Sequence, residues 1–338
     1  MINFAIMRLF LISIFVFCSL YSHSQENTLS QILNYTPAIN PAFVGLVNNS
    51  KIFVDQRNQW LKYNNGFNTS TLGFDKYIKD YFLGVGGNIQ FFKTPTGFSK
   101  TNLNLQLSEV FALGNKTGIR FGVQNSLVYL KNSENYIFGD QLNNDGVVAP
   151  SSSDLAILNT SKMYWSLGVG TVLFGEKWWI GTSFWNINQP QTAVIGSNNE
   201  PINYNVNAGY RFFISNATGL QKEKRKTMAT IFNYKKWAGA TQLELSAIAN
   251  LHPILLGAGY RGMPILKSQI IQNDAFIILV GYRNENIVFA YNYDIPISYL
   301  GFSTTGSHEI SCSFLWGDLV AGGRKTFRKV NLTGPLMY

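Results

Sequence analysis

The chain has 338 residues, of which 46% are hydrophobic, 14% aromatic and 13% charged, and its formal net charge is +9. Two cysteines are too few for a disulfide framework, and no HExxH or CxxC pattern of the common zinc motifs is present. The basic residues are scattered except for one run, Lys222 to Lys226, so the charge does not indicate a nucleic-acid partner. We interpret that run as a solvated turn, with an acidic partner or anionic lipid headgroups as the alternative.

Residues 1–24 have the pattern of a secretory signal peptide. Arg8 provides the positive n-region, an apolar core follows from Leu9 to Leu20, and Ser22-His23-Ser24 has the small-x-small form of a cleavage site. The core is shorter than the roughly 20 residues that a spanning helix needs, which favours export over anchoring. Cys18 raises the alternative of a lipoprotein, but the small residue that lipidation requires does not precede it.

Residues 25–50 are the least strand-like part of the exported chain. The sequence Asn40-Pro41-Ala42-Phe43-Val44-Gly45 contains a proline and a glycine, which interrupt any regular element. Apolar residues such as Leu33, Ile39 and Leu46 give the segment something to bury. We expect an N-terminal arm or plug segment that packs in or against the mouth of the main domain; a flexible periplasmic leader is the alternative.

Residues 51–316 show strand-like alternation repeatedly. From Asn102 to Ser108, leucine occupies every second position and amide or hydroxyl side chains occupy the others. Neighbouring side chains on a strand point to opposite faces, so such a strand presents one face to lipid and one to a polar interior. The pattern returns in the last hairpin, Ile287 to Trp316. About 14 segments of roughly 10 residues fit, which predicts an all-β fold: a transmembrane antiparallel β-barrel of about 14 strands in the outer membrane.

The longest polar insert runs from Lys131 to about Ser161. We expect it outside the cell, as a candidate contact surface, because the long loops of such barrels are extracellular. Its Asn143-Asn144-Asp145-Gly146 has the composition of a calcium loop, but the acidic residues are too sparse for an EF-hand, which favours a solvated loop.

The expected inward residues are amides, serines and glycines with few opposed charges, which suits either a wet or a plugged pore. Glycine clusters at Gly84–Gly87 and Gly168–Gly170 have no helix after them, so we interpret them as close-packing points on the wall rather than nucleotide loops. The pair Trp178-Trp179 beside a tight turn predicts an aromatic girdle at the headgroup level.

Ser307-His308-Glu309 contains the residue types of a hydrolase triad. Adjacent residues on a strand point to opposite faces, so these three cannot assemble with one another. The two other histidines, His23 in the signal peptide and His252, are far away in the sequence. We therefore expect a protein that is not an enzyme and that needs no cofactor and no metal.

Several short motifs follow one another along nearly the whole exported chain: Asn40-Pro41-Ala42, Gly45, Arg57, Gln59-Trp60, Gly84, Gly86, Tyr291, Tyr293-Asp294 and Gly306-Ser307-His308-Glu309-Ile310. Taken together in their order and spacing, these motifs resemble the PorP/SprF outer-membrane proteins of the type IX secretion system and gliding motility.

The resemblance implies a non-catalytic barrel that supports secretion and surface anchoring of a large adhesin with a type B C-terminal domain. Other type IX secretion components and outer-membrane lipid are further expected partners, and no nucleic acid is expected. A passive outer-membrane channel or hydrophobic-solute transporter is the alternative function. The family offers no catalytic residues to carry over. The matching residues are therefore candidates for holding barrel geometry or binding a client: Arg57, Trp60, Asp294, His308 and Glu309.

Of these candidates, Asp294, His308 and Glu309 are interpreted first as a polar network that caps the last hairpin. The expected organisation is a signal peptide at 1–24, an N-terminal arm or plug at 25–50, a β-barrel at 51–316 and a C-terminal tail at 317–338. The tail is basic and follows the last strand-like segment. The expected location is the outer membrane of a Gram-negative bacterium.

Overall fold

The computed structural model describes residues 36–46, 50–62, 66–114, 116–132, 141, 161–192, 199–215, 226–237, 240–262, 273–297 and 305–317. The predicted signal peptide at 1–24, the first part of the predicted arm, nearly all of the polar insert between 133 and 160, and the tail after residue 317 lie outside the described residues. Within the described ranges, no helix is long and apolar enough to cross a membrane.

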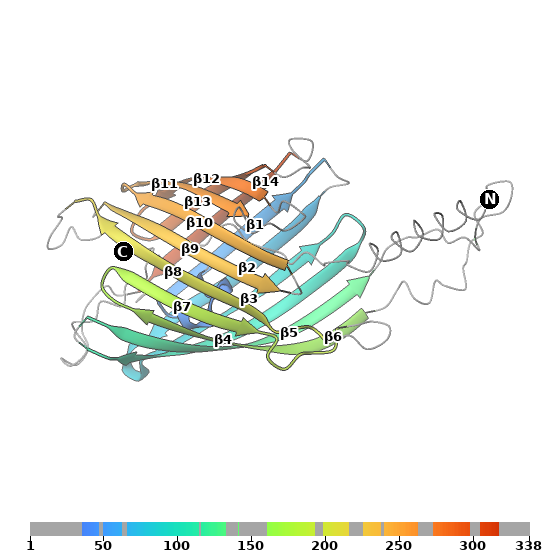
Figure 1. The fold of residues 1–338 in the computed structure, drawn as a ribbon, viewed down its shortest axis with the longest axis horizontal. Coiled ribbons are helices and arrows are strands. Elements are labelled where there is room, and N and C mark those ends of the chain that lie inside the picture. The colour runs from blue at the N-terminus through green and yellow to red at the C-terminus, as the bar shows by residue number, and fades with distance from the viewer. Residues whose placement is uncertain are drawn as a thin grey trace, which may run out of the picture.

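Fourteen antiparallel strands form one closed barrel, in which each strand pairs with the next along the chain and β14 pairs with β1 (Figure 1). The predicted transmembrane barrel of about 14 strands is thereby confirmed. The strands are β1 (Ser50–Gln59), β2 (Phe67–Ile78), β3 (Leu83–Lys93), β4 (Phe98–Ala112), β5 (Gly118–Asn132), β6 (Ser161–Phe174), β7 (Trp178–Trp185), β8 (Asn203–Phe213), β9 (Thr227–Trp237), β10 (Ala240–Asn250), β11 (Ile254–Gly262), β12 (Asn273–Arg283), β13 (Ile287–Pro296) and β14 (Ser307–Trp316).

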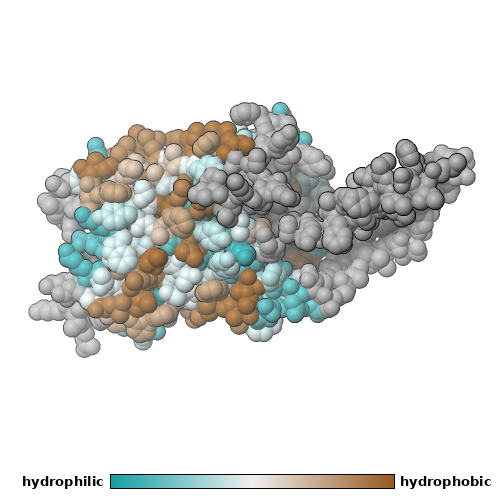
Figure 2. Space-filling model, viewed as in Figure 1, coloured by the Kyte–Doolittle hydropathy of each residue, from teal (hydrophilic) through white to brown (hydrophobic). Residues whose placement is uncertain are grey.

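The alternating sequence pattern becomes an apolar outer face and a largely polar inner one. On β4, Leu105 is 60% exposed on the outside, whereas its neighbour Gln106 is 2% exposed on the inside. Apolar side chains cover much of the visible outer surface (brown in Figure 2), and hydrophilic ones gather mainly near its two ends. In a membrane the exposed apolar face contacts lipid, and closure leaves no strand edge without hydrogen-bond partners.

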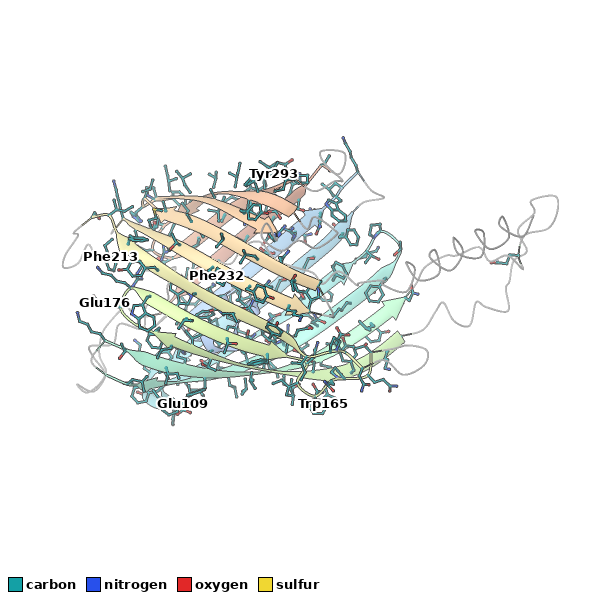
Figure 3. All side chains as sticks on the ribbon, in the orientation of Figure 1. Glu109, Trp165, Glu176, Phe213, Phe232 and Tyr293 are labelled. Atoms are coloured by element: carbon teal, nitrogen blue, oxygen red, sulfur yellow. The ribbon has the colours of Figure 1, made fainter. Side chains whose placement is uncertain are left out.

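The two ends of the barrel differ in the length of their connections. Short turns join β2 to β3, β4 to β5, β6 to β7 and β12 to β13, and at this same end β1 begins and β14 ends. Short turns mark the periplasmic end of outer-membrane barrels. Figure 3 shows Glu176 and Phe213 at this end, and Trp165 and Tyr293 toward the other. The connection from β5 to β6, residues 133–160, leaves from the opposite, extracellular end.

The tryptophan pair at the start of β7 divides between the two faces. Trp178 is 37% exposed on the outer surface, in agreement with the predicted girdle, but Trp179 is 4% exposed and lies inside the barrel. Its ring lies over Gly209, where an added Cβ would be 2.0 Å from the Trp179 side chain. The girdle interpretation is therefore wrong for Trp179, because consecutive strand residues cannot both face lipid.

Leu105→Arg should destabilise the membrane-folded barrel by about 2–4 kcal/mol, because the new charge would lie on the lipid face near the middle of β4. Thr101→Arg, on the same face of β4 but closer to its extracellular end, should cost about 0–1 kcal/mol. Urea titration in lipid vesicles, followed by the gel mobility of the folded form, measures both. Equal losses for the two variants would contradict this orientation of β4 in the membrane.

Candidate functional site in the barrel interior

Residues 36–46, hereafter the luminal segment, lie inside the barrel against the wall (dark blue in Figure 1). Two 3₁₀ turns, Thr36–Ala38 and Pro41–Phe43, shape it. Asn40 caps the second turn: its Oδ1 accepts a hydrogen bond from the Ala42 amide at 2.9 Å. The Asn40 Nδ2 donates to the backbone carbonyls of Thr171 on β6 and Thr182 on β7, both at 3.0 Å. One buried amide thus fixes both the local turn and its place on the wall.

Side chains of the wall bind the backbone of the luminal segment. The Arg120 guanidinium on β5 donates to the carbonyls of Val44 at 2.7 Å and Gly45 at 3.1 Å. Ser108 on β4 also donates to the Val44 carbonyl, at 2.6 Å. The Gly45 amide in turn donates to a carboxylate oxygen of Asp75 on β2. Hydrogen bonds to charged groups are the stronger ones, so Arg120 and Asp75 hold this end of the segment.

Three inward glycines let the luminal segment touch the backbone of the wall. An added Cβ would lie 2.2 Å from the Val44 carbonyl oxygen at Gly84, 2.2 Å from the Ala42 amide nitrogen at Gly122, and 2.0 Å from the Asn40 Oδ1 at Gly170. Real side chains do not approach that closely, so no residue larger than glycine fits these positions without displacement. The interpretation of the Gly84 and Gly170 clusters as close-packing points is confirmed.

Apolar side chains complete this contact. Ile39, Phe43 and Leu46 of the luminal segment are buried together with inward residues of the wall: Tyr77, Val110, Val172, Phe174 and Trp179. Burial of apolar area supplies the non-directional part of the attraction, while the hydrogen bonds fix the position. The luminal segment is therefore packed as a core element would be.

A second cluster of buried groups joins the two ends of the strand sequence. Arg57 on β1 forms ion pairs with Asp294 on β13, at 2.7 Å, and with Glu309 on β14, at 2.8 Å. Arg261 on β11 contacts the same Asp294 oxygen at 2.8 Å. All four side chains are at most 3% exposed. We call these four residues the seam network, because they bridge the strands on either side of barrel closure.

Two further acidic side chains extend the seam network along the inner face. Glu244 on β10 lies directly opposite Arg261. Asp55 on β1 lies diagonally across from Glu309, since its register partner is Ser311. The expectation of few opposed charges inside the barrel is therefore wrong. Ion-pair partners come from strands far apart in the sequence, where a local pattern cannot pair them.

The structure divides the five candidate residues. Arg57, Asp294 and Glu309 meet in the seam network, but His308 points outward, where its Nδ1 lies 2.7 Å from the Tyr291 hydroxyl and its ring 4.9 Å from that of Tyr293. The interpretation of Asp294, His308 and Glu309 as one polar network is therefore wrong for His308.

Trp60 lies just beyond the end of β1, with a positive φ of 59°. Its ring packs edge-on against Phe67 at 5.5 Å, and its backbone amide donates to the Gly306 carbonyl at 2.9 Å. Trp60 therefore links the β1–β2 connection to the start of β14, away from the seam network.

Sequence reasoning did not single out Arg120 or Arg261 as site residues. Arg120 stands on the inward side of a clear alternating strand, and a lone arginine among small inward residues is a signal that a buried partner exists. Arg261 ends a weakly patterned segment, and its partner Asp294 lies two strands away. No local signal connects that pair.

Much of the described interior is packed rather than open to water. Inward side chains on both sides of the barrel, such as Arg120, Asn207 and Glu309, are almost inaccessible to water. Within the described ranges, no group of three or more His, Cys, Asp or Glu side chains is arranged to hold a metal ion. The geometry can hold a peptide segment and fix the strand register.

A closed antiparallel barrel with an apolar outer belt, short turns at one end and a charged, packed interior defines an outer-membrane β-barrel protein. Within this class, residues 22–314 match the family model described as type IX secretion system membrane protein PorP/SprF, so the chain belongs to that family. The family resemblance inferred from the motifs is confirmed.

Solved structures with a similar fold include Omp33 of Acinetobacter baumannii, with a TM-score of 0.44 and 6% identity over 80% of this chain and 100% of that chain. The toluene transporter TodX of P. putida has a TM-score of 0.45 and 11% identity over 86% of this chain and 95% of that chain. At these identities nothing about activity transfers from either protein. No curated protein matches the chain significantly.

Asp294→Asn should destabilise the barrel by about 3–5 kcal/mol, because it removes the shared counter-charge of two buried arginines. The matched control is Glu176→Gln in the β6–β7 turn, where the carboxylate lies 3.0 Å from Lys116 in an exposed pair. The hydrogen bond from Lys116 lowers the pKa of Glu176, but solvent screens such a pair, and its loss should cost about 0–1 kcal/mol. Urea unfolding in vesicles measures both variants; similar losses would contradict the importance of the seam network.

Gly122→Ala should loosen the luminal segment, because the new methyl group would overlap the Ala42 backbone. The control Gly114→Ala adds the same group in an exposed turn, where the nearest atom is 3.2 Å away. Chymotrypsin digestion of the folded barrel reports cleavage after Phe43, which is 2% exposed in the wild type. We expect rapid cleavage only in Gly122→Ala. Equal protection in both variants would show that the segment does not depend on this contact.

Proposed function

We propose that this barrel is a non-catalytic component of the type IX secretion system that supports secretion of a large surface adhesin and anchors it at the cell surface. The client is an adhesin with a type B C-terminal domain. Membership of the PorP/SprF family supports the link to type IX secretion. The adhesin itself, and any contact with other components of the secretion system, belong to the proposal.

The observation that carries the proposal is the occupied interior. Arg120 and Asp75 hold the luminal segment against the wall, and the seam network fills the inner face near the other end. A channel for small solutes needs an open, hydrated path, and inward side chains along such a path would be exposed. The buried interior therefore favours a barrel that binds other proteins at its surface or at its ends over the alternative, a passive channel.

The extracellular end is the part of the barrel that an anchored adhesin can reach. The connection between β5 and β6, residues 133–160, leaves from that end and is the longest insert in the sequence. Long, polar extracellular connections are common binding surfaces of outer-membrane barrels, while the strands beneath supply a rigid support. We therefore place the client contact on this connection.

The test is a deletion strain complemented with tagged variants of the barrel. Residues 142–158 are replaced by a short Gly-Ser linker in one variant, and residues 94–97 of the β3–β4 connection at the same end are replaced in the control. We expect wild type and control to display the adhesin on the surface and to co-purify with it in mild detergent. The 142–158 variant should release the adhesin into the medium.

Three outcomes would contradict the proposal. Adhesin display that persists in the deletion strain would remove the barrel from the process. Co-purification of periplasmic ring subunits without an adhesin would make the barrel a part of the machine rather than an anchor. Steady conductance of the purified wild-type barrel in planar bilayers, with no bound client, would favour the channel.

A further inference from the structure

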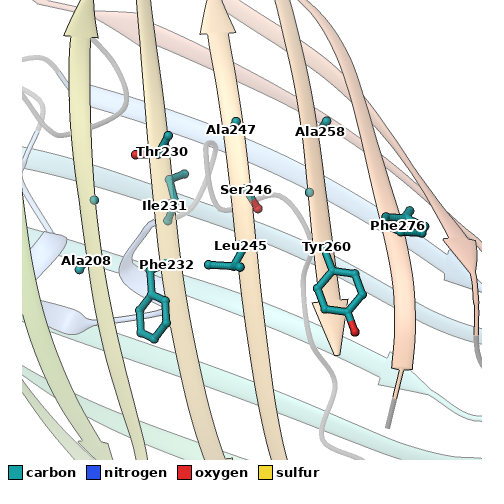
Figure 4. A pocket seen from close by; sticks show the side chains of 12 residues that line it. Ala208, Thr230, Ile231, Phe232, Leu245, Ser246, Ala247, Ala258, Tyr260 and Phe276 are labelled. Atoms are coloured by element: carbon teal, nitrogen blue, oxygen red, sulfur yellow. The ribbon is translucent and has the colours of Figure 1, made fainter. Parts of the chain in front are cut away.

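A groove of about 600 Å³ lies on the lipid-facing side of β8 to β12 (Figure 4). Its volume falls within the range of about 300–1,000 Å³ that is usual for ligand sites. The outward residues at its floor are small: Thr230 on β9, Ala247 on β10 and Ala258 on β11. They are register partners on adjacent strands, so they form one continuous row across the sheet.

Larger side chains border this row. The next outward row toward the extracellular end holds Phe232, Leu245 and Tyr260, which are again register partners, with Phe276 beside them. All four line the groove (Figure 4). The large apolar side chains and the row of small residues beside them therefore form a depression in the lipid-facing surface, about as deep as one layer of side chains.

A cation lies on the same outer face, closer to the extracellular end. Lys236 is four residues beyond Phe232 on β9, about 13 Å at the usual strand rise. The Lys236 ammonium is 5.8 Å from the centre of the Tyr204 ring, and the Tyr204 and Tyr234 rings are 6.2 Å apart. Lys236 makes no ion pair with any described residue. Tyrosine and lysine side chains at this depth are typical of the boundary between lipid and water.

We propose that the groove and Lys236 together bind one phosphorylated, acylated lipid of the outer leaflet. The headgroup phosphate pairs with the Lys236 ammonium beside Tyr204, and one acyl chain follows β9 downward past Phe232 to lie over Thr230, Ala247 and Ala258. Charge complementarity selects the headgroup. The recessed apolar groove opens into the bilayer and takes the acyl chain, because the chain buries apolar surface against Phe232, Leu245 and Tyr260.

The test uses the full-length barrel, purified in mild detergent and titrated with lipid A, while native mass spectrometry counts bound lipid. Phosphatidylcholine is the control lipid, since it has acyl chains but no net charge. Ala247→Trp fills the groove from the lipid-facing side, where a larger apolar residue is compatible with folding. Val123→Trp adds the same ring to the outer face of β5, outside the groove. Lys236→Gln removes the cation alone.

We expect one lipid A per wild-type barrel and the same in Val123→Trp. Ala247→Trp, which takes up the space of the acyl chain, and Lys236→Gln, which removes one charge-assisted contact, should each lower the affinity at least about tenfold. Phosphatidylcholine should bind at least tenfold more weakly than lipid A. Equal lipid A affinity in Ala247→Trp and Val123→Trp would overturn the proposal, as would equal binding of the two lipids. A second copy of the barrel, bound to the wild type but not to Ala247→Trp, would instead identify the groove as a protein contact.

Discussion

Closure of the barrel depends on one pairing, that of β1 with β14, which are more than 240 residues apart in the sequence. Hydrogen bonds between the strands are available in any register, so side chains must select the right one. In the observed register Arg57 lies opposite Glu309. A shift by one residue would turn either Arg57 or Glu309 toward lipid. A shift by two residues would place Glu309 opposite Asp55 in one direction and opposite Gln59 in the other, and in both cases Arg57 would lose Glu309 as its partner. Each alternative leaves a buried charge without its partner, which costs far more than the ion pair itself contributes.

Two groups of buried contacts lie at different levels along the barrel axis. Near the extracellular end, the seam network holds the strands on either side of closure. Toward the periplasmic end, Arg120, Asp75 and the bare backbone at Gly84 and Gly122 hold the luminal segment. The two groups of contacts share no residue. A force applied at the extracellular end would therefore not be transmitted to the luminal segment through a shared side chain.

Alternation in the sequence predicted the barrel because the pattern is local: apolar side chains at every second position of a strand mark the face that contacts lipid. Alternation also placed Glu309 and His308 on opposite faces of the last strand. The candidates Arg57, Asp294 and Glu309 came from the family resemblance instead. Alternation could not pair Arg261 with Asp294, nor place Asn40 between β6 and β7, since each of these contacts joins separate elements of the chain that no local pattern connects. The error at Trp179 has another origin: a tight turn beside two tryptophans predicts a girdle for the pair, whereas alternation along β7 lets only one of them face lipid.

The position of the luminal segment before β1 has a consequence for the order of assembly. All of its described hydrogen bonds to the wall, and all the glycines that it touches, belong to β2 through β7. The first half of the strands thus provides a complete cradle. A curved half-barrel can receive the segment while its concave side is still open, and the later strands then enclose it. Every described hydrogen-bond partner of the luminal segment on the wall is therefore present in the half-barrel of β2 to β7, which does not include the pairing of β14 with β1.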